Sequence, residues 1–157
     1  MKTNIGISEE NRKKVAVELT KFLANEYVLY TKTKTAHWNS EGIDFSDKHK
    51  LFDEQANQLE IIIDSIAERI RSLDHYVPSS LGNFLQLSSL KEVVLAKTDS
   101  KTFIKELLLD HETIIQELRK KINVFEEDLG DIGSGDFTTG LMQEHEKTAW
   151  ILRAHLK

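Results

Sequence analysis

The sequence of 157 residues predicts an all-α protein, a bundle of four long helices with a long crossover between the second and the third. One proline and seven glycines, three of them within residues 130–135, leave long stretches without a helix breaker. Apolar residues recur in steps of three and four, and the period-two alternation of strands is absent. The length suits one domain over residues 1–157, with a short tail at residues 1–7.

The first helix is expected to begin after Ser8 and to run to about His37. Ser8 is a good N-cap residue, and Glu9 and Glu10 follow in the first turn, where acids interact favourably with the helix dipole. A polar link over residues 39–42 then separates this helix from the next. One face of the helix is apolar and includes Val15, Leu19, Phe22, Leu29 and Ala36.

The second helix is expected to open near Asp44 or Ser46 and to end before Pro78. Its apolar residues follow each other in alternating steps of four and three, which is the pattern of a bundle seam. These residues are Phe52, Ala56, Leu59, Ile63, Ile66, Ile70 and Leu73.

Residues 79–98 are interpreted as a crossover with one short helix, because they start polar and uncharged and become amphipathic around Leu90, Val93 and Val94. The third long helix takes Asp99 or Ser100 as its cap and stops at Gly130. Its apolar residues are Phe103, Leu107, Ile114, Leu118, Ile122, Phe125 and Leu129.

The fourth helix is expected to begin at a cap on Asp136, after a Gly-rich link, and to run to the C-terminus. Its apolar face passes through Leu141, Trp150 and Leu152. Two tight links and one long middle connection describe a ferritin-like arrangement of the four helices.

The composition excludes several classes of protein. The 21 Lys and Arg against 26 Asp and Glu give a net charge of −5, which disfavours a compact domain that binds nucleic acid by neutralising phosphates. Because the chain has no cysteine, it has neither a disulfide framework nor a thiolate metal site, and it is compatible with a reducing cytoplasm. No apolar run approaches the roughly 18 residues of a membrane span, so no membrane partner is expected.

Five residues of metal-binding type stand at helical spacing. His37 closes the first helix, His49 and Asp53 are four residues apart in the second, and Asp64 and Glu68 repeat that spacing further along. Residues four apart share a helix face, so each pair can offer two ligands to one ion. The four residues of the second helix fall within a sector of roughly 100°.

The two groups of ligands cannot bind the same ion within one chain. Asp53 and Asp64 are 11 residues apart, which is roughly 16 Å along a straight helix, whereas metal–ligand bonds are about 2 Å long. Two copies packed antiparallel about a two-fold axis could each lend the end with His37, His49 and Asp53 to the other's Asp64 and Glu68. The predicted site therefore belongs to a dimer.

The ligand types favour iron, manganese or zinc, since imidazole and carboxylate are present and thiolate is not. No Glu-x-x-His pair occurs, so the usual di-iron site inside a bundle is not expected. His111-Glu112 and His145-Glu146 lack the second histidine of a zinc protease motif, and the glycines at 130–135 follow a helix rather than a strand.

Several other residues are assigned structural roles. The histidines outside the predicted site are interpreted as structural: His111, His145 and His155. The aromatic residues of the third and fourth helices are interpreted as core: Phe103, Phe125 and Trp150. The acids near the junction of these helices are expected to be solvated and to form caps: Glu126, Glu127, Asp128, Asp131 and Asp136.

The run Thr35-Ala36-His37-Trp38-Asn39, followed by the four ligand-type residues of the second helix, resembles the ferroxidase motif of the Dps family. These proteins are the DNA-protecting miniferritins of starved bacterial cells. The closing stretch 145–154 is also similar to the last helix of the family, so the resemblance covers nearly the whole chain.

The resemblance implies a hollow homododecamer that oxidises Fe²⁺ with hydrogen peroxide, or with oxygen, and stores ferric mineral inside. It places His37, His49 and Asp53 of one subunit opposite Asp64 and Glu68 of the partner. Trp38, beside the site, is then placed to relay or quench oxidising equivalents, although packing at an interface explains it equally well. The acids between residues 126 and 136 would neighbour pores that draw in ferrous ions.

The sequence departs from the DNA-binding members of the family in its tail, which has one lysine, Lys2, before Ser8. Twelve copies of a chain of charge −5 repel DNA, so DNA binding is expected to be weak, in a protein of the cytoplasm or the nucleoid. Two alternatives stay open: a nucleoid-compacting structural protein with incidental metal binding, and a helical interaction module without metal chemistry.

Overall fold

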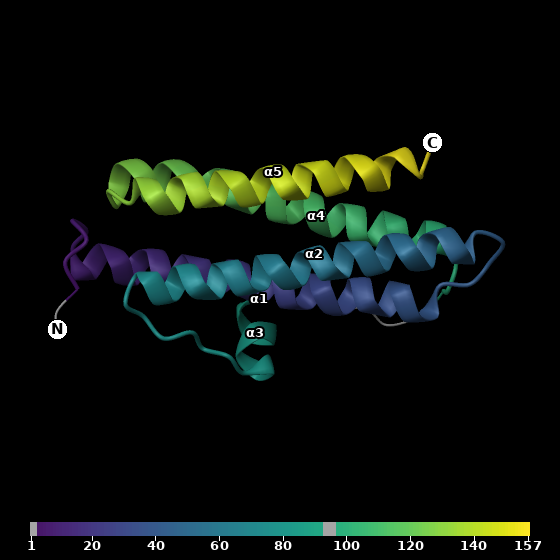
Figure 1. The fold of residues 1–157 in the computed structure, drawn as a ribbon, viewed down its shortest axis with the longest axis horizontal. Coiled ribbons are helices and arrows are strands. Elements are labelled where there is room, and N and C mark those ends of the chain that lie inside the picture. The colour runs from purple at the N-terminus through teal and green to yellow at the C-terminus, as the bar shows by residue number, and fades with distance from the viewer. Residues whose placement is uncertain (1–2, 93–96) are drawn as a thin grey trace.

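The computed structural model describes residues 3–92 and 97–157, which fold into two helical hairpins joined by a crossover. Figure 1 shows α1 and α2 lying antiparallel beside α4 and α5, while the short α3 stands outside the bundle next to α1. The helices are α1 (Glu9–Asn39), α2 (Phe45–Ser72), α3 (Leu81–Leu87), α4 (Ser100–Asn123) and α5 (Ile132–Ala154). A π-helical segment, η1 (Val124–Asp128), extends α4. The predicted all-α, ferritin-like bundle is confirmed.

The first three long helices begin where the sequence indicates. The Ser8 hydroxyl accepts a hydrogen bond from the backbone N–H of Asn11, and the Asp99 carboxylate accepts one from Thr102. Asp44 precedes α2 without capping it, and its carboxylate accepts a hydrogen bond from Ser100 Oγ at 2.6 Å. This contact joins the turn between α1 and α2 to the start of α4.

The predicted start of α5 is wrong, because the helix begins more than one turn before Asp136. Its N-cap is Asp131, whose carboxylate accepts hydrogen bonds from the backbone N–H and the hydroxyl of Ser134, while Asp136 lies exposed inside the helix. Asp131 is also buried against Arg69 of α2, with an N–O distance of 2.9 Å, so it is not a solvated acid. The glycines that suggested a link therefore belong to the helix, except Gly130, whose φ of +66° ends η1.

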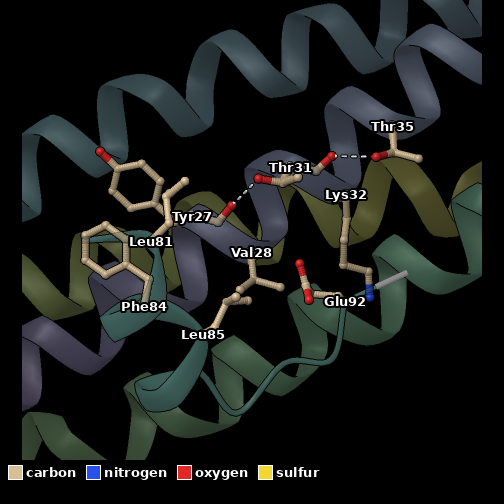
Figure 2. A pocket seen from close by; sticks show the side chains of 9 residues that line it. All are labelled: Tyr27, Val28, Thr31, Lys32, Thr35, Leu81, Phe84, Leu85 and Glu92. Carbon is tan, nitrogen blue, oxygen red and sulfur yellow. Dashed lines mark hydrogen bonds between the residues drawn. The ribbon is translucent and has the colours of Figure 1, made fainter. Parts of the chain in front are cut away.

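The crossover contains its short helix earlier than the amphipathic residues suggest. α3 ends at Leu87, Leu90 follows in a bend, and Val93 and Val94 lie outside the described residues. Phe84 of α3 stacks on Tyr27 of α1 with ring centroids 4.3 Å apart. Figure 2 shows these rings at one end of a shallow pocket of about 210 Å³ between α1 and α3.

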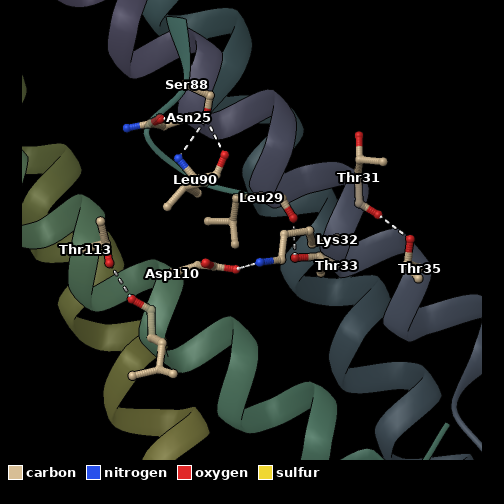
Figure 3. Close-up of polar contacts among 11 residues, drawn as sticks. Asn25, Leu29, Thr31, Lys32, Thr33, Thr35, Ser88, Leu90, Asp110 and Thr113 are labelled. Atoms are coloured by element: carbon tan, nitrogen blue, oxygen red, sulfur yellow. Dashed lines mark hydrogen bonds and ion pairs between the residues drawn. The ribbon is translucent and has the colours of Figure 1, made fainter. Parts of the chain in front are cut away.

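Polar contacts fasten the segment after α3 and the middle of α4 to α1. The Asn25 carboxamide oxygen accepts hydrogen bonds from Ser88 Oγ at 2.8 Å and from the Ser89 backbone N–H at 2.9 Å. Lys32 forms an ion pair with Asp110 at 2.5 Å, as Figure 3 shows. Burial raises the pKa of Asp110, and the Lys32 ammonium opposes that rise.

The core is a continuous apolar cluster along the bundle axis. It includes Val15, Leu19, Leu29, Phe52, Ile66, Ile70, Phe103, Leu107, Ile114, Leu118 and Phe125. Trp150, which was expected in the core, is instead 63% exposed on α5, because it lies on the side of that helix facing away from the bundle. Among residues 3–92 and 97–157, no helix is long and apolar enough to cross a membrane.

Candidate metal centre

His37 and His49 meet across the turn between α1 and α2, as their positions predict. Gly42, with φ +131°, lies in this turn, and the two imidazole rings stack with centroids 3.9 Å apart. Nδ1 of His37 lies 2.9 Å from the backbone carbonyl of His49, and Nδ1 of His49 lies 2.9 Å from that of His37.

These reciprocal contacts fix the tautomer of both rings. A carbonyl oxygen only accepts, so each Nδ1 must carry the hydrogen and donate it. The tautomer with hydrogen on Nδ1 has its lone pair on Nε2, the ring nitrogen that makes no hydrogen bond to the backbone. A histidine whose other nitrogen is held by a carbonyl is oriented as a metal ligand.

Asp53 lies one helical turn beyond His49, with Oδ1 3.6 Å from His37 Nε2. Lys34 of α1 reaches the same oxygen, with Nζ at 3.3 Å, and also lies 5.7 Å from the centre of the Trp38 ring. The Lys34 ammonium thus places a positive charge next to the Asp53 carboxylate. Trp38 is 66% exposed beside this group.

Asp64 and Glu68 are exposed in the second half of α2, away from the turn that holds the histidines. The single chain does not bring the five predicted residues together. Within the part of the chain that the structure describes, no three His, Asp or Glu side chains are grouped so that they could hold a metal ion. The assignment of a shared site stays a prediction.

A second polar cluster, which sequence reasoning missed, lies inside the bundle. Nδ1 of His111 on α4 is 2.8 Å from Nδ1 of His145 on α5, and Nε2 of His145 is 3.0 Å from Oε1 of Glu26 on α1. All three side chains are buried. Burial, and then the neighbouring His145, hold the pKa of His111 well below its usual value, so this ring is neutral at pH 7.

A signal for this cluster was present in the sequence. Glu26, His111 and His145 each interrupt the apolar face of a long helix, and three such interruptions can meet in one bundle. The structural interpretation of the two histidines holds for their burial. It did not anticipate that a carboxyl group would join them.

The comparisons agree with this fold. The model of the ferritin family, described as a ferritin-like domain, matches residues 17–157, which is nearly the whole chain. The structure of a Dps protein from Vibrio cholerae O1, described as a member of a broad superfamily of ferritin-like diiron-carboxylate proteins, is similar over 100% of this chain and 98% of its own, with a TM-score of 0.92 and 30% identity. Fold and sequence together define a ferritin-like protein.

Two relatives in sequence indicate which family of ferritin-like proteins the chain belongs to. A protein named DNA protection during starvation protein 2, from Bacillus anthracis, is 31% identical over 92% of this chain and 97% of its own length. A low temperature-induced protein of Nostoc, itself uncharacterized, is 40% identical over 98% of this chain and 86% of its own. The chain belongs to the Dps family of ferritin-like proteins.

Proposed function

We propose that this chain is the subunit of an iron-oxidising and iron-storing shell. The observation that supports this most is the pair of carbonyl-anchored histidines, His37 and His49, which both keep an Nε2 lone pair next to the Asp53 carboxylate. Two imidazoles and a carboxylate suit Fe²⁺, which is the substrate. Membership of the Dps family is consistent with this chemistry.

The proposed site needs a second subunit. His37, His49 and Asp53 of one chain bind the ferrous ion together with Asp64 and Glu68 of its two-fold partner, because a single chain separates these groups by roughly 16 Å. Large apolar side chains that a monomer leaves in water support assembly into a dodecamer: Ile61, Leu109, Ile132 and Trp150.

The carboxylates neutralise the charge that increases on oxidation from Fe²⁺ to Fe³⁺. Each ferrous ion gives up one electron, and hydrogen peroxide takes up two electrons and two protons to become two water molecules. Oxygen is the other candidate oxidant. Lys34 must move off Asp53 when iron binds. Trp38, which is exposed and lies next to Lys34, would donate an electron to a stray oxidant.

Mixed assemblies test the shared site. One variant, His37→Ala/His49→Ala, loses the histidine half, and the other, Asp64→Ala/Glu68→Ala, loses the carboxylate half. Each alone should slow peroxide-dependent Fe²⁺ oxidation on the order of tenfold or more. Coexpressed in equal amounts, they should regain about a quarter of the parent activity, because half of the dimers are mixed and each mixed dimer carries one complete site of two.

Size-exclusion chromatography of each variant checks that the shell assembles. Activity of the mixture equal to the mean of the two variants would show that the two halves do not form one site. Unchanged Fe²⁺ oxidation in the His37→Ala/His49→Ala variant would show that these histidines are not the ligands.

A second candidate function is compaction of the nucleoid, which would require DNA binding; the name of the Bacillus anthracis relative refers to DNA protection. The net charge of −5 per chain opposes it. A gel-shift titration at two salt concentrations separates the functions: retardation that weakens with salt, in a protein without iron oxidation, favours compaction.

A further inference from the structure

Each of the four long helices places one polar side chain at the same cluster inside the bundle. These residues are Glu26 of α1, Gln55 of α2, His111 of α4 and His145 of α5, and their exposed fractions lie between 0% and 6%. In ferritin-like bundles, inward-facing polar residues from facing helices build metal sites. None of the four belongs to the proposed interface site.

Several atoms of this interior cluster have no hydrogen-bond partner among the described residues. They are both carboxyl oxygens of Glu26, both amide atoms of Gln55, and Nε2 of His111 and His145. Burying a polar atom without a partner is costly, and native proteins satisfy nearly all such atoms with protein, water or an ion. So many unpartnered polar atoms in one place, among them the two carboxyl oxygens of Glu26, indicate that a further species binds there.

The arrangement around His145 matches a metal ligand. When its Nδ1 donates to Nδ1 of His111, at 2.8 Å, the lone pair of His145 lies on Nε2, which is 3.0 Å from Oε1 of Glu26. Those two atoms are close but not aligned as a hydrogen bond. Two ligands at right angles on one ion, with bonds near 2.1 Å, are about 3 Å apart.

We infer that Glu26 and His145 bind one divalent transition-metal ion inside each subunit. Gln55 supplies an amide oxygen, water completes the coordination, and His111 acts as a positioning residue that orients His145. This interior site is separate from the interface between subunits, and it does not depend on the proposed iron oxidation.

The surroundings of the cluster leave room for about one water molecule. A cavity of about 10 Å³, close to the size of one water molecule, is bordered by Gln55, His111 and His145. Gln58 of α2 and the exposed Glu144 of α5 also border this cavity, and the Gln58 amide donates a hydrogen bond to the Glu144 carboxylate.

The donor set limits the ion to a class. Imidazole and carboxylate without thiolate bind Zn²⁺, Fe²⁺, Mn²⁺ or Co²⁺ better than Cu⁺. Co²⁺ is a useful probe because its visible absorption reports an imidazole-containing coordination sphere directly.

The experiment uses the full-length His37→Ala/His49→Ala protein, in which the interface site is disabled. After treatment with a chelator, it is titrated with Co²⁺ while visible absorption and bound metal per chain are measured. We expect one Co²⁺ per subunit with a ligand-field band. In the same background, Glu26→Gln should abolish the band, and His111→Phe should weaken binding by about tenfold or more.

His155→Asn is the matched control, since His155 lies just after α5 and is exposed. It should leave the band and the stoichiometry unchanged. Anomalous scattering from Zn²⁺-soaked crystals of the His37→Ala/His49→Ala protein locates the ion without any interior substitution, so a folding defect cannot decide the result. No bound metal among the four long helices, or a band that survives Glu26→Gln, overturns the inference.

Discussion

The bundle contains two histidine pairs that are held in different ways. His37 and His49, at the turn between α1 and α2, each contact the backbone carbonyl of the other. His111 and His145, between α4 and α5, contact each other through Nδ1, and their ring centroids are 5.0 Å apart. The first pair is therefore oriented by the backbone, and the second by side chains alone.

Because the two pairs are held differently, substitutions in them should affect different properties of the protein. When a side chain is removed from the turn, water can reach the carbonyl that it leaves, because both rings there are partly exposed. When one is removed from the interior, its partner stays buried without a hydrogen bond, and a cavity is left behind. We therefore expect substitutions at the turn to change iron chemistry and substitutions in the interior to change folding.

The largest predicted effect compares His145→Ala with His49→Ala in metal-free protein. His145→Ala should lower the free energy of unfolding by about 2–4 kcal/mol, because it opens a cavity and leaves His111 buried without its hydrogen-bond partner. His49→Ala should lower it by less than about 1 kcal/mol. Urea unfolding at one fixed protein concentration measures both values, since assembly makes stability depend on concentration.

A triple variant provides the control. Glu26→Leu/His111→Leu/His145→Leu removes every partner at once, and replacing a buried polar cluster by apolar residues is often neutral or stabilising. It should recover most of the stability that His145→Ala loses. Equal losses from His145→Ala and His49→Ala would contradict the distinction between the two pairs.

The turn pair could be predicted from the sequence, whereas for the interior cluster the sequence marks the polar residues but not that they meet. His37 and His49 are 12 residues apart on either side of a short polar link, so local geometry places them together. Glu26, His111 and His145 come from three helices, and their meeting depends on helix packing and rotation. The sequence also gives no sign that Lys34 reaches Asp53, because that contact depends on the crossing of α1 and α2.

The helix boundaries show the same limit. Ser8 and Asp99 cap helices through residues three positions ahead, so their roles are local and predictable. Asp131 also caps its helix locally, but Gly133 and Gly135 in the first turn of α5 made that turn resemble a link. Its burial comes from Arg69, which is 62 residues away in the sequence. Trp150 was misassigned because the apolar face of α5 is weakly defined.

The pH dependence of stability offers a second test of the interior pair. The folded protein keeps the pKa of His111 well below 6.5, whereas the unfolded chain takes up a proton near that pH. Protons therefore favour the unfolded state, and the free energy of unfolding should fall as the pH drops below about 6.5, by up to about 1.4 kcal/mol per pH unit.

Urea unfolding of chelator-treated protein at several pH values, from about 7.5 to about 5, measures this slope. This range brackets the pKa of histidine in the unfolded chain. His111→Asn should flatten it, while His155→Asn, at an exposed position, should leave most of it in place. The same slope in the parent and in His111→Asn would mean that another group controls the pH dependence.

The smallest predicted effect concerns Lys34, which occupies the carboxylate of Asp53 beside the turn pair. Its ammonium lies 3.3 Å from Asp53 Oδ1, and an incoming cation must displace it. Lys34→Met should raise the apparent affinity for Fe²⁺ roughly two- to fivefold, the range expected for one partly exposed charge pair. Initial oxidation rates across a series of Fe²⁺ concentrations measure this. Lys50→Met, which removes the same charge from an exposed position next to His49, is the control; an equal gain there would assign the effect to net charge rather than to the contact with Asp53.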